Sequence, residues 1–319
     1  MKAPLFIKLF SSFDFRKKGK MGPDSKAHHK MTFVLVILLL VVTLVGCGQT
    51  NTSMPQKTDA GNTNQIDALI EQAKNEIENN DVDKALADLN KALALDPNRA
   101  VAYAYRGSAY EKQNDLAKAL ADFNKVIELN PKSGTAYYNR GYAYQLQNDL
   151  ANALADYNQA LELDPTIGLA YANRGGVYIF QKEFAKAIAD YGKAIELDPK
   201  NALLYGNRAG AYFGLNDYKA ALEDLNKALE LDPKDGSSYA LRGLTYSKQN
   251  EMQKALDDFN KAIELNPSKP TYYFNRATIY AGTGEKDKAI ADYQKVLELS
   301  QDAALRQNAQ AQLDKLGVK

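Results

Sequence analysis

Proline recurs in the chain at a fixed spacing of 34 residues, at positions 97, 131, 165, 199, 233 and 267. A fixed period of this length is typical of a chain built from one small unit repeated many times, in which each unit buries its apolar face only against its neighbours. When the proline is placed at position 32 of the unit, seven units begin at residues 66, 100, 134, 168, 202, 236 and 270, and the seventh has Gln301 in place of the proline. The spacing therefore predicts one repeat array over residues 66–303 instead of two ordinary globular domains.

Each unit has the residue pattern of two helices joined by a short turn. Tyrosine at positions 4 and 11 and a small residue at position 8 fall on one face of a first helix, and alanine at position 20 with an aromatic residue or leucine at position 24 mark a second helix. Between them lies a polar pair such as Asn114-Asp115, in which asparagine tolerates the left-handed conformation and aspartate suits a helix N-cap. The pattern predicts an all-α fold.

This pattern resembles the tetratricopeptide repeat. The resemblance implies antiparallel helix pairs stacked into an α-solenoid with a right-handed superhelix. The polar segment 304–319 is expected to form a C-terminal capping helix that stops at Gly317. Two departures carry expectations: Glu76 replaces the aromatic residue at position 11, which predicts a weaker first unit, and the missing proline of the seventh unit predicts that its second helix runs on toward the capping helix. The seven units are 66–99, 100–133, 134–167, 168–201, 202–235, 236–269 and 270–303.

The N-terminal 46 residues have the pattern of a secretory signal. Residues 1–30 hold eight basic and two acidic residues, and residues 31–46 are an uncharged apolar run. The run is shorter than the roughly 20 residues of a membrane-spanning helix, which favours a cleaved signal over an uncleaved membrane anchor. Both interpretations export the rest of the chain. The start of translation is either Met1 or Met21.

The apolar run ends in Leu44-Val45-Gly46-Cys47, and Cys47 is the single cysteine of the chain. These residues resemble the bacterial lipobox, which implies that Cys47 is acylated and becomes the mature N-terminus. Residues 47–65 would then be the lipidated Cys47 and a flexible polar tether, because the segment is too polar to bury a core. The sequence predicts a protein anchored by its lipid to a membrane and facing outside the cytoplasm, in a one- or a two-membrane organism.

Two charged columns repeat with the units. Position 7 lies before the central turn by nearly as many residues as position 23 lies after it, so the two come level in an antiparallel helix pair. We therefore expect a structural ion pair in each unit, with a row of arginines for an anionic ligand as the alternative. The expected partners are Arg106 with Asp122, Arg140 with Asp156, Arg174 with Asp190, Arg208 with Asp224, Arg242 with Asp258, and Arg276 with Asp292.

The resemblance also implies a binding groove. In this family the first helices line a concave surface through positions 2, 5, 6, 9, 12 and 13, and asparagine at position 6 holds the backbone of an extended peptide, since an amide both donates and accepts hydrogen bonds. The alternative is that the asparagines were only copied when the repeat was duplicated. The groove residues predicted in this way are Asn139, Asn173, Asn207 and Asn275, with Tyr105, Tyr138, Tyr142, Ile179, Phe180, Phe213 and Phe274.

Composition disfavours catalysis, cofactors, metals and nucleic acid as functions of the repeats. Both histidines lie in the first 30 residues, no phosphate-binding loop or nucleophile motif is present, and residues 31–319 hold 32 basic and 37 acidic residues. The function predicted is a non-enzymatic scaffold of the cell envelope that binds an extended segment of a protein partner. The alternatives are a self-associating structural protein, which would be a homo-oligomer, and an adaptor for envelope proteases or peptidoglycan hydrolases.

Overall fold

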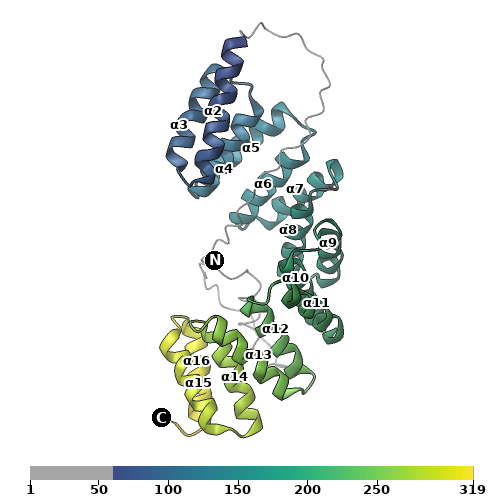
Figure 1. Cartoon of the computed structure of the whole chain (residues 1–319), viewed down its shortest axis with the longest axis vertical. Helices are drawn as coiled ribbons and strands as arrows, with labels where there is room; N and C mark the ends of the chain where they lie inside the picture. The colour runs from purple at the N-terminus through teal and green to yellow at the C-terminus, as the bar shows by residue number, and fades with distance from the viewer. Residues whose placement is uncertain (1–59, 319) are drawn as a thin grey trace, which may run out of the picture. The chain divides into compact units, whose positions relative to one another are not determined.

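The computed structural model describes residues 60–318, which contain 15 helices and no strand (Figure 1). They form two compact units that meet within one helix, at Arg174 and Gly175, and each is described by itself. We name them the N-terminal unit (residues 60–174) and the C-terminal unit (residues 175–318). The predicted signal segment 1–46, Cys47 and most of the tether lie outside the described residues.

Both units are all-helical solenoids in which successive helices pack as antiparallel pairs (Figure 1). The N-terminal unit contains α2 (Ala60–Glu78), α3 (Val82–Leu95), α4 (Ala100–Lys112), α5 (Leu116–Leu129), α6 (Gly134–Leu146), α7 (Leu150–Leu163) and the start of α8 (Gly168–Phe180). The C-terminal unit contains the end of α8, α9 (Phe184–Leu197), α10 (Ala202–Gly214), α11 (Tyr218–Leu231), α12 (Gly236–Lys248), α13 (Met252–Leu265), α14 (Pro270–Thr283), α15 (Lys286–Leu299) and α16 (Ala303–Lys315).

Where the turn inside a pair holds an asparagine, that residue has the left-handed conformation predicted for it; Lys182 and Gly284 take its place in the turns after α8 and α14. Asn114 has φ of 61°, and the following Asp115 accepts a hydrogen bond from the backbone N–H of Lys118 at 3.3 Å. The left-handed residue ends the first helix and the aspartate caps the second. The other non-glycine residues with positive φ in the described part of the chain are Asn80, Asn148, Lys182, Asn216 and Asn250.

The core of each helix pair is built around the side chain at position 24. Phe123 is fully buried, and a Cβ atom added to Gly107 would lie 2.7 Å from the Cε1 atom of its ring. The ring therefore occupies the space that the glycine leaves on the facing helix. Tyr157, Tyr191, Leu225, Phe259 and Tyr293 are buried at the same position of the following pairs.

The ends of the array differ from the expectations drawn from the sequence. Helix α2 begins at Ala60, so residues 60–65 are helical instead of belonging to the tether. The expected continuation of α15 toward the capping helix is wrong, because α15 ends at Leu299 and α16 begins at Ala303. Ser300 is extended, and the carboxylate of Asp302 accepts hydrogen bonds from the N–H groups of Ala304 and Leu305. This N-cap starts a new helix in place of the old one.

Within residues 60–318 no helix combines the length and the apolar character needed to cross a bilayer.

Candidate functional site

The arginines of position 7 bind aspartates of position 23 in a bidentate manner. Arg106 donates from Nε and Nη2 to the two carboxylate oxygens of Asp122, both at 2.8 Å. The aspartate side chain is 7% exposed and the arginine side chain 20% exposed, so the pair lies at the edge of the core. The same geometry joins Arg140 to Asp156, Arg208 to Asp224, Arg242 to Asp258, and Arg276 to Asp292. Arg174 and Asp190 belong to different units.

The third guanidinium nitrogen of five of these six arginines joins its pair of helices to the pair before it. Arg106 Nη1 donates to Asn90 Oδ1 at 2.7 Å, and the guanidinium lies over the ring of Tyr103 with 5.2 Å between its Cζ atom and the ring centroid. The hydroxyl of Tyr103 in turn donates to the carbonyl of Pro97. These contacts satisfy the arginine inside the protein, so a row of free arginines for an anionic ligand is not what the structure presents.

We call this contact between successive helix pairs the joint. The asparagine that accepts the hydrogen bond was not predicted from the sequence, although asparagine recurs at position 25, two residues after the aspartate. It serves Arg140, Arg174, Arg242 and Arg276 through Asn124, Asn158, Asn226 and Asn260. Position 25 of the fourth repeat is Gly192, and a Cβ atom added there would lie 3.8 Å from Arg208 Nη1, in ordinary contact. The joint between α9 and α10 therefore lacks one hydrogen bond.

We expect Gly192→Asn to stabilise the protein by about 1 kcal/mol, because it supplies the missing acceptor to Arg208 and removes a glycine from the interior of a helix. Gly192→Ala is the matched control, since it gains only the helix propensity, about 1 kcal/mol. Thermal unfolding followed by circular dichroism measures both. In an Arg208→Met background the gain from asparagine should shrink while the gain from alanine remains; equal gains in both backgrounds would contradict the joint.

In the N-terminal unit the predicted groove residues differ in their exposure. Tyr138 is buried, with 7% of its surface exposed, and its ring packs against Tyr157 with 6.0 Å between the ring centroids. Its hydroxyl accepts a hydrogen bond from Asn173 Nδ2 at 3.3 Å. The expectation that Tyr138 is an exposed groove residue is therefore corrected. Its side chain belongs to the core, and Asn173 uses one of its two N–H donors to bind the Tyr138 hydroxyl. Asn139, Tyr105 and Tyr142 are half-buried and keep part of their surface open.

One carboxyl group in this region was missed by the sequence reasoning. Glu111, near the end of α4, has a carboxyl oxygen, Oε1, that is buried and makes no hydrogen bond with any residue the structure describes. Burial raises the pKa of Glu111 to about 8. Its charge also raises the pKa of Tyr142 on α6, so these two side chains are neighbours. The signal that could have found Glu111 is its place at position 12, one of the groove positions.

In the C-terminal unit two of the predicted amides remain available. Within the described residues, the side chains of Asn207 and Asn275 make no hydrogen bond to another residue, and both are half-buried. Two apolar side chains on first helices of this unit are exposed, Phe180 at the end of α8 at 36% and Leu203 on α10 at 39%. Ile179 is buried, and is therefore corrected from groove to core.

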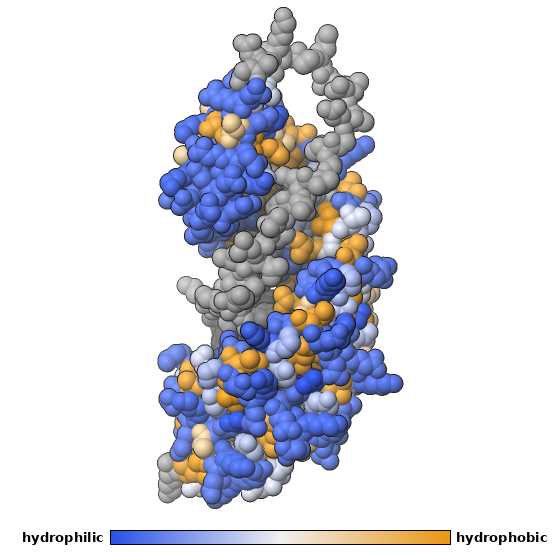
Figure 2. All heavy atoms as spheres, viewed as in Figure 1, coloured by the Kyte–Doolittle hydropathy of each residue, from blue (hydrophilic) through white to orange (hydrophobic). Residues whose placement is uncertain are grey.

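Phe213 and Phe274 are half-buried, because each ring packs edge-on against a tyrosine of the following second helix. The ring centroids of Phe213 and Tyr218, and of Phe274 and Tyr293, are 5.5 Å apart. On the visible coloured surface, hydrophobic residues form several areas among hydrophilic ones (Figure 2).

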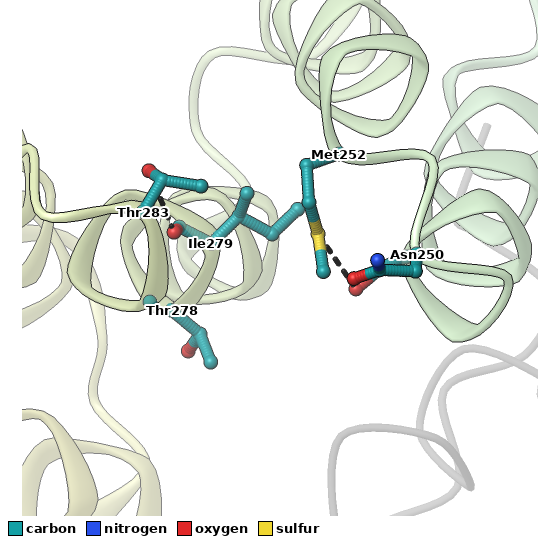
Figure 3. A pocket seen from close by; sticks show the side chains of 7 residues that line it. Asn250, Met252, Thr278, Ile279 and Thr283 are labelled. Atoms are coloured by element: carbon teal, nitrogen blue, oxygen red, sulfur yellow. Dashed lines mark hydrogen bonds between the residues drawn. The ribbon is translucent and has the colours of Figure 1, made fainter.

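A pocket of about 340 Å³ lies between the C-terminal ends of α12 and α14 and the start of α13 (Figure 3). It is lined by Ser247, Asn250, Met252, Thr278, Ile279, Gly282 and Thr283. The lining offers hydroxyl, amide and thioether groups and no ionisable side chain, so it can bind a chain segment by shape and hydrogen bonds but holds no acid or base. Ser247, Thr278 and Gly282 stand at groove positions 12, 9 and 13 of their repeats. In the described part of the chain no cluster of three histidine, cysteine, aspartate or glutamate side chains could hold a metal ion.

Comparison with protein families shows which repeat this is. The tetratricopeptide repeat model matches residues 100–133, 134–167, 168–201, 202–235 and 237–269, and two further tetratricopeptide models match residues 74–114 and 270–303. Together these matches cover more than half of the chain. No protein of curated function matches the sequence.

Solved structures share the fold at low sequence identity. A tetratricopeptide repeat protein from Parabacteroides merdae is 22% identical, with a TM-score of 0.59 over 77% of this chain and 97% of its own. The pilF protein of Pseudomonas aeruginosa is 19% identical, with a TM-score of 0.58 over 67% of this chain and 97% of its own. The C-terminal part of a repeat protein from Cytophaga hutchinsonii is 20% identical, with a TM-score of 0.58 over 75% and 98%. At these identities the likeness concerns the fold alone.

Proposed function

Because the chain belongs to the tetratricopeptide repeat family, we propose that its first helices bind an extended segment of a protein partner, and that it does so as a non-enzymatic lipoprotein scaffold of the cell envelope. The repeat fold is suited to protein–protein interaction and is typical of scaffolds without catalytic activity. Binding would assist the assembly or recruitment of an envelope complex. If the partner is an envelope protease or a peptidoglycan hydrolase, the protein would act as an adaptor for that enzyme.

The observation that carries the proposal is the pair of uncommitted amides in the C-terminal unit. An amide side chain that is half-buried and has no partner leaves a donor and an acceptor for a ligand, and one such group pairs with a peptide unit whatever its side chain. Asn207 and Asn275 occupy the same register on α10 and α14. Exposed apolar side chains such as Phe180 and Leu203 supply the contacts that protein interfaces bury.

A photo-crosslinking residue placed at Leu203 tests the proposal in cells. We expect adducts with a partner protein from this position and few from Ala189, an exposed residue of the second helix α9. The double variant Asn207→Ala, Asn275→Ala should reduce the adducts about tenfold or more, since each lost hydrogen bond is worth about 1 kcal/mol. The matched control, Asn98→Ala, removes an exposed amide from an inter-repeat turn and should change nothing.

Two outcomes would contradict the groove. Adducts formed only with a second copy of this chain would favour the self-associating structural protein. Adducts with a partner that persist undiminished in the double asparagine variant would show that binding does not use these amides.

Membrane attachment through Cys47 is tested by intact mass. We expect the membrane-extracted protein to lack residues 1–46 and to carry acyl groups, and Cys47→Ala to remain uncleaved and unacylated. The two interpretations differ because a lipid anchor needs the thiol, whereas an apolar helix does not. A wild-type chain that retains residues 31–46 and no acyl group would overturn the lipoprotein proposal in favour of an uncleaved anchor.

A further inference from the structure

Glu111 is the only ionisable residue at its register in the seven repeats. Position 12 of the first helix holds, in order, Ile77, Glu111, Gln145, Ile179, Phe213, Ser247 and Ala281. This position lies at the boundary with the following helix pair, and Ile179 is 2% exposed there. A carboxyl group at such a place has to be hydrogen-bonded or neutral, because burying an unpaired charge is costly. Within the described residues its Oε1 atom is buried and has no partner.

The next repeat shows what Glu111 lacks. There Gln145 occupies the same register, and its Oε1 atom accepts a hydrogen bond of 2.6 Å from the hydroxyl of Tyr157 at position 24. In the repeat of Glu111 position 24 is Phe123, whose ring has no hydroxyl group. The fold therefore repeats the acceptor but leaves out the donor, and Glu111, whose side chain as a whole is only partly buried, has an oxygen without a donor among the described residues.

Tyrosines surround the carboxyl, and no cation of the described residues forms an ion pair with it. Burial raises the pKa values of Tyr138 and Tyr142 on α6 and of Tyr157 on α7, and the charge of Glu111 adds to the rise of each. Lys112, the next residue of α4, donates to the carbonyl of Ile77. The basic groups on the helices packed against α4 have acidic partners. The pairs are Lys74 with Glu71 from α2, Lys84 with Asp81 and Lys91 with Asp88 from α3, Lys118 with Asp115 and Lys125 with Glu128 from α5, and Arg140 of α6 with Asp156.

We propose that Glu111 receives the cationic side chain of a lysine or arginine in a protein segment bound along the first helices of the N-terminal unit. The proposal rests on the proposed function and adds to it the chemistry of one ligand position. An ammonium or guanidinium group supplies the donors that Phe123 lacks and the charge that the surrounding tyrosines do not. Lysine and arginine carry that charge and several donors over the whole neutral pH range, whereas histidine does so only when protonated.

Binding of a cation here is coupled to the loss of a proton. With a pKa of about 8, the carboxyl of the empty site is mostly protonated at neutral pH, and a cation binds its ionised form. The affinity for a basic segment should therefore rise about tenfold per pH unit below pH 8 and level off above it. A neutral segment should show no such rise.

The experiment selects a library of random short peptides on the full chain held in mild detergent, as wild type and as Glu111→Gln. The variant folds, since the next repeat carries Gln145 at this register. Glu128→Gln is the matched control, because it removes one negative charge from an exposed pair with Lys125 on α5. We expect lysine or arginine to be enriched at one peptide position with the wild type and with Glu128→Gln, but not with Glu111→Gln.

The affinity of one selected peptide, and of its copy with norleucine in place of the basic residue, is then measured between pH 6 and pH 9. The basic peptide should bind more tightly as the pH rises, and the norleucine copy at least tenfold more weakly above pH 8 and without a slope. Two results would overturn the role of Glu111 but not peptide binding by the groove. One is selected peptides without an enriched lysine or arginine, and the other is a basic peptide whose affinity for Glu111→Gln rises with pH as it does for the wild type. Failure of every library member to bind either protein would overturn the proposed function as well.

Discussion

Replacing Arg242 by alanine is expected to lower the free energy of unfolding by about 3 kcal/mol, because it leaves Asp258 as an unpaired buried charge. Arg242 donates two hydrogen bonds of 2.8 Å to Asp258 and a third to Asn226 of the preceding helix pair. Its side chain is 20% exposed and that of Asp258 is 8% exposed, so water compensates the loss only in part. Urea unfolding followed by circular dichroism measures the change, and hydrogen exchange should show it to be centred on α12 and α13.

Two further variants show whether the destabilisation comes from leaving Asp258 without a partner or from losing the ion pair as such. The double variant Arg242→Met, Asp258→Leu removes both charges and should recover most of the stability, since a buried pair is close to neutral against apolar residues. Lys261→Ala breaks an exposed pair with Glu264 and should cost less than about 0.5 kcal/mol. An unchanged unfolding midpoint in Arg242→Ala would refute the structural role.

The stability of the wild type relative to Glu111→Gln is expected to fall as the pH rises from 5 to 8. The folded pKa of Glu111, about 8, lies above the unfolded value, so the folded state holds its proton more tightly than the unfolded state. The stabilisation is complete below the unfolded pKa and is lost as the pH passes through the folded pKa, at no more than about 1.4 kcal/mol per pH unit. Melting temperatures of both proteins across this range measure the difference.

The control for this titration is Glu128→Gln, whose carboxylate is exposed. It should track the wild type at every pH. A Glu111→Gln variant whose melting temperature runs parallel to that of the wild type from pH 5 to pH 8 would show that Glu111 is ionised in the empty groove, and that no proton is released when a cation binds.

Much of the fold could be predicted because the helices and turns of the repeat depend on residues that are close together in the sequence. Asn114 and Asp115 predict a helix end and a helix start from the conformation and hydrogen bonding of the two residues themselves. The break between α15 and α16 was missed because Ser300 and Asp302 end one helix and cap the next without the proline on which the repeat pattern relied. The predicted tether was too long for a similar reason, since polar residues extend the first turns of α2.

The candidate site was less predictable, because a repeat position does not determine how exposed a side chain is. Tyr138 and Tyr142 both stand at predicted groove positions, yet Tyr138 is buried against Tyr157 while Tyr142 is half-buried. Asn173 was predicted to bind a ligand, but its side-chain amide donates a hydrogen bond to the hydroxyl of Tyr138. Whether such a residue is buried in the core or exposed in the groove depends on the side chains that pack against it.

By itself the sequence determined the repeat, its helices, its turns and the partners that come level across a helix pair, because each follows from spacing along one dimension. Only the tertiary structure decided how one repeat meets the next. It placed asparagines of the preceding pair beside the arginines, and it set the carboxyl of Glu111 in a position where Phe123 offers no hydroxyl. Burial and hydrogen-bond satisfaction are properties of three-dimensional neighbours, and a period of 34 residues does not specify where one repeat differs from another.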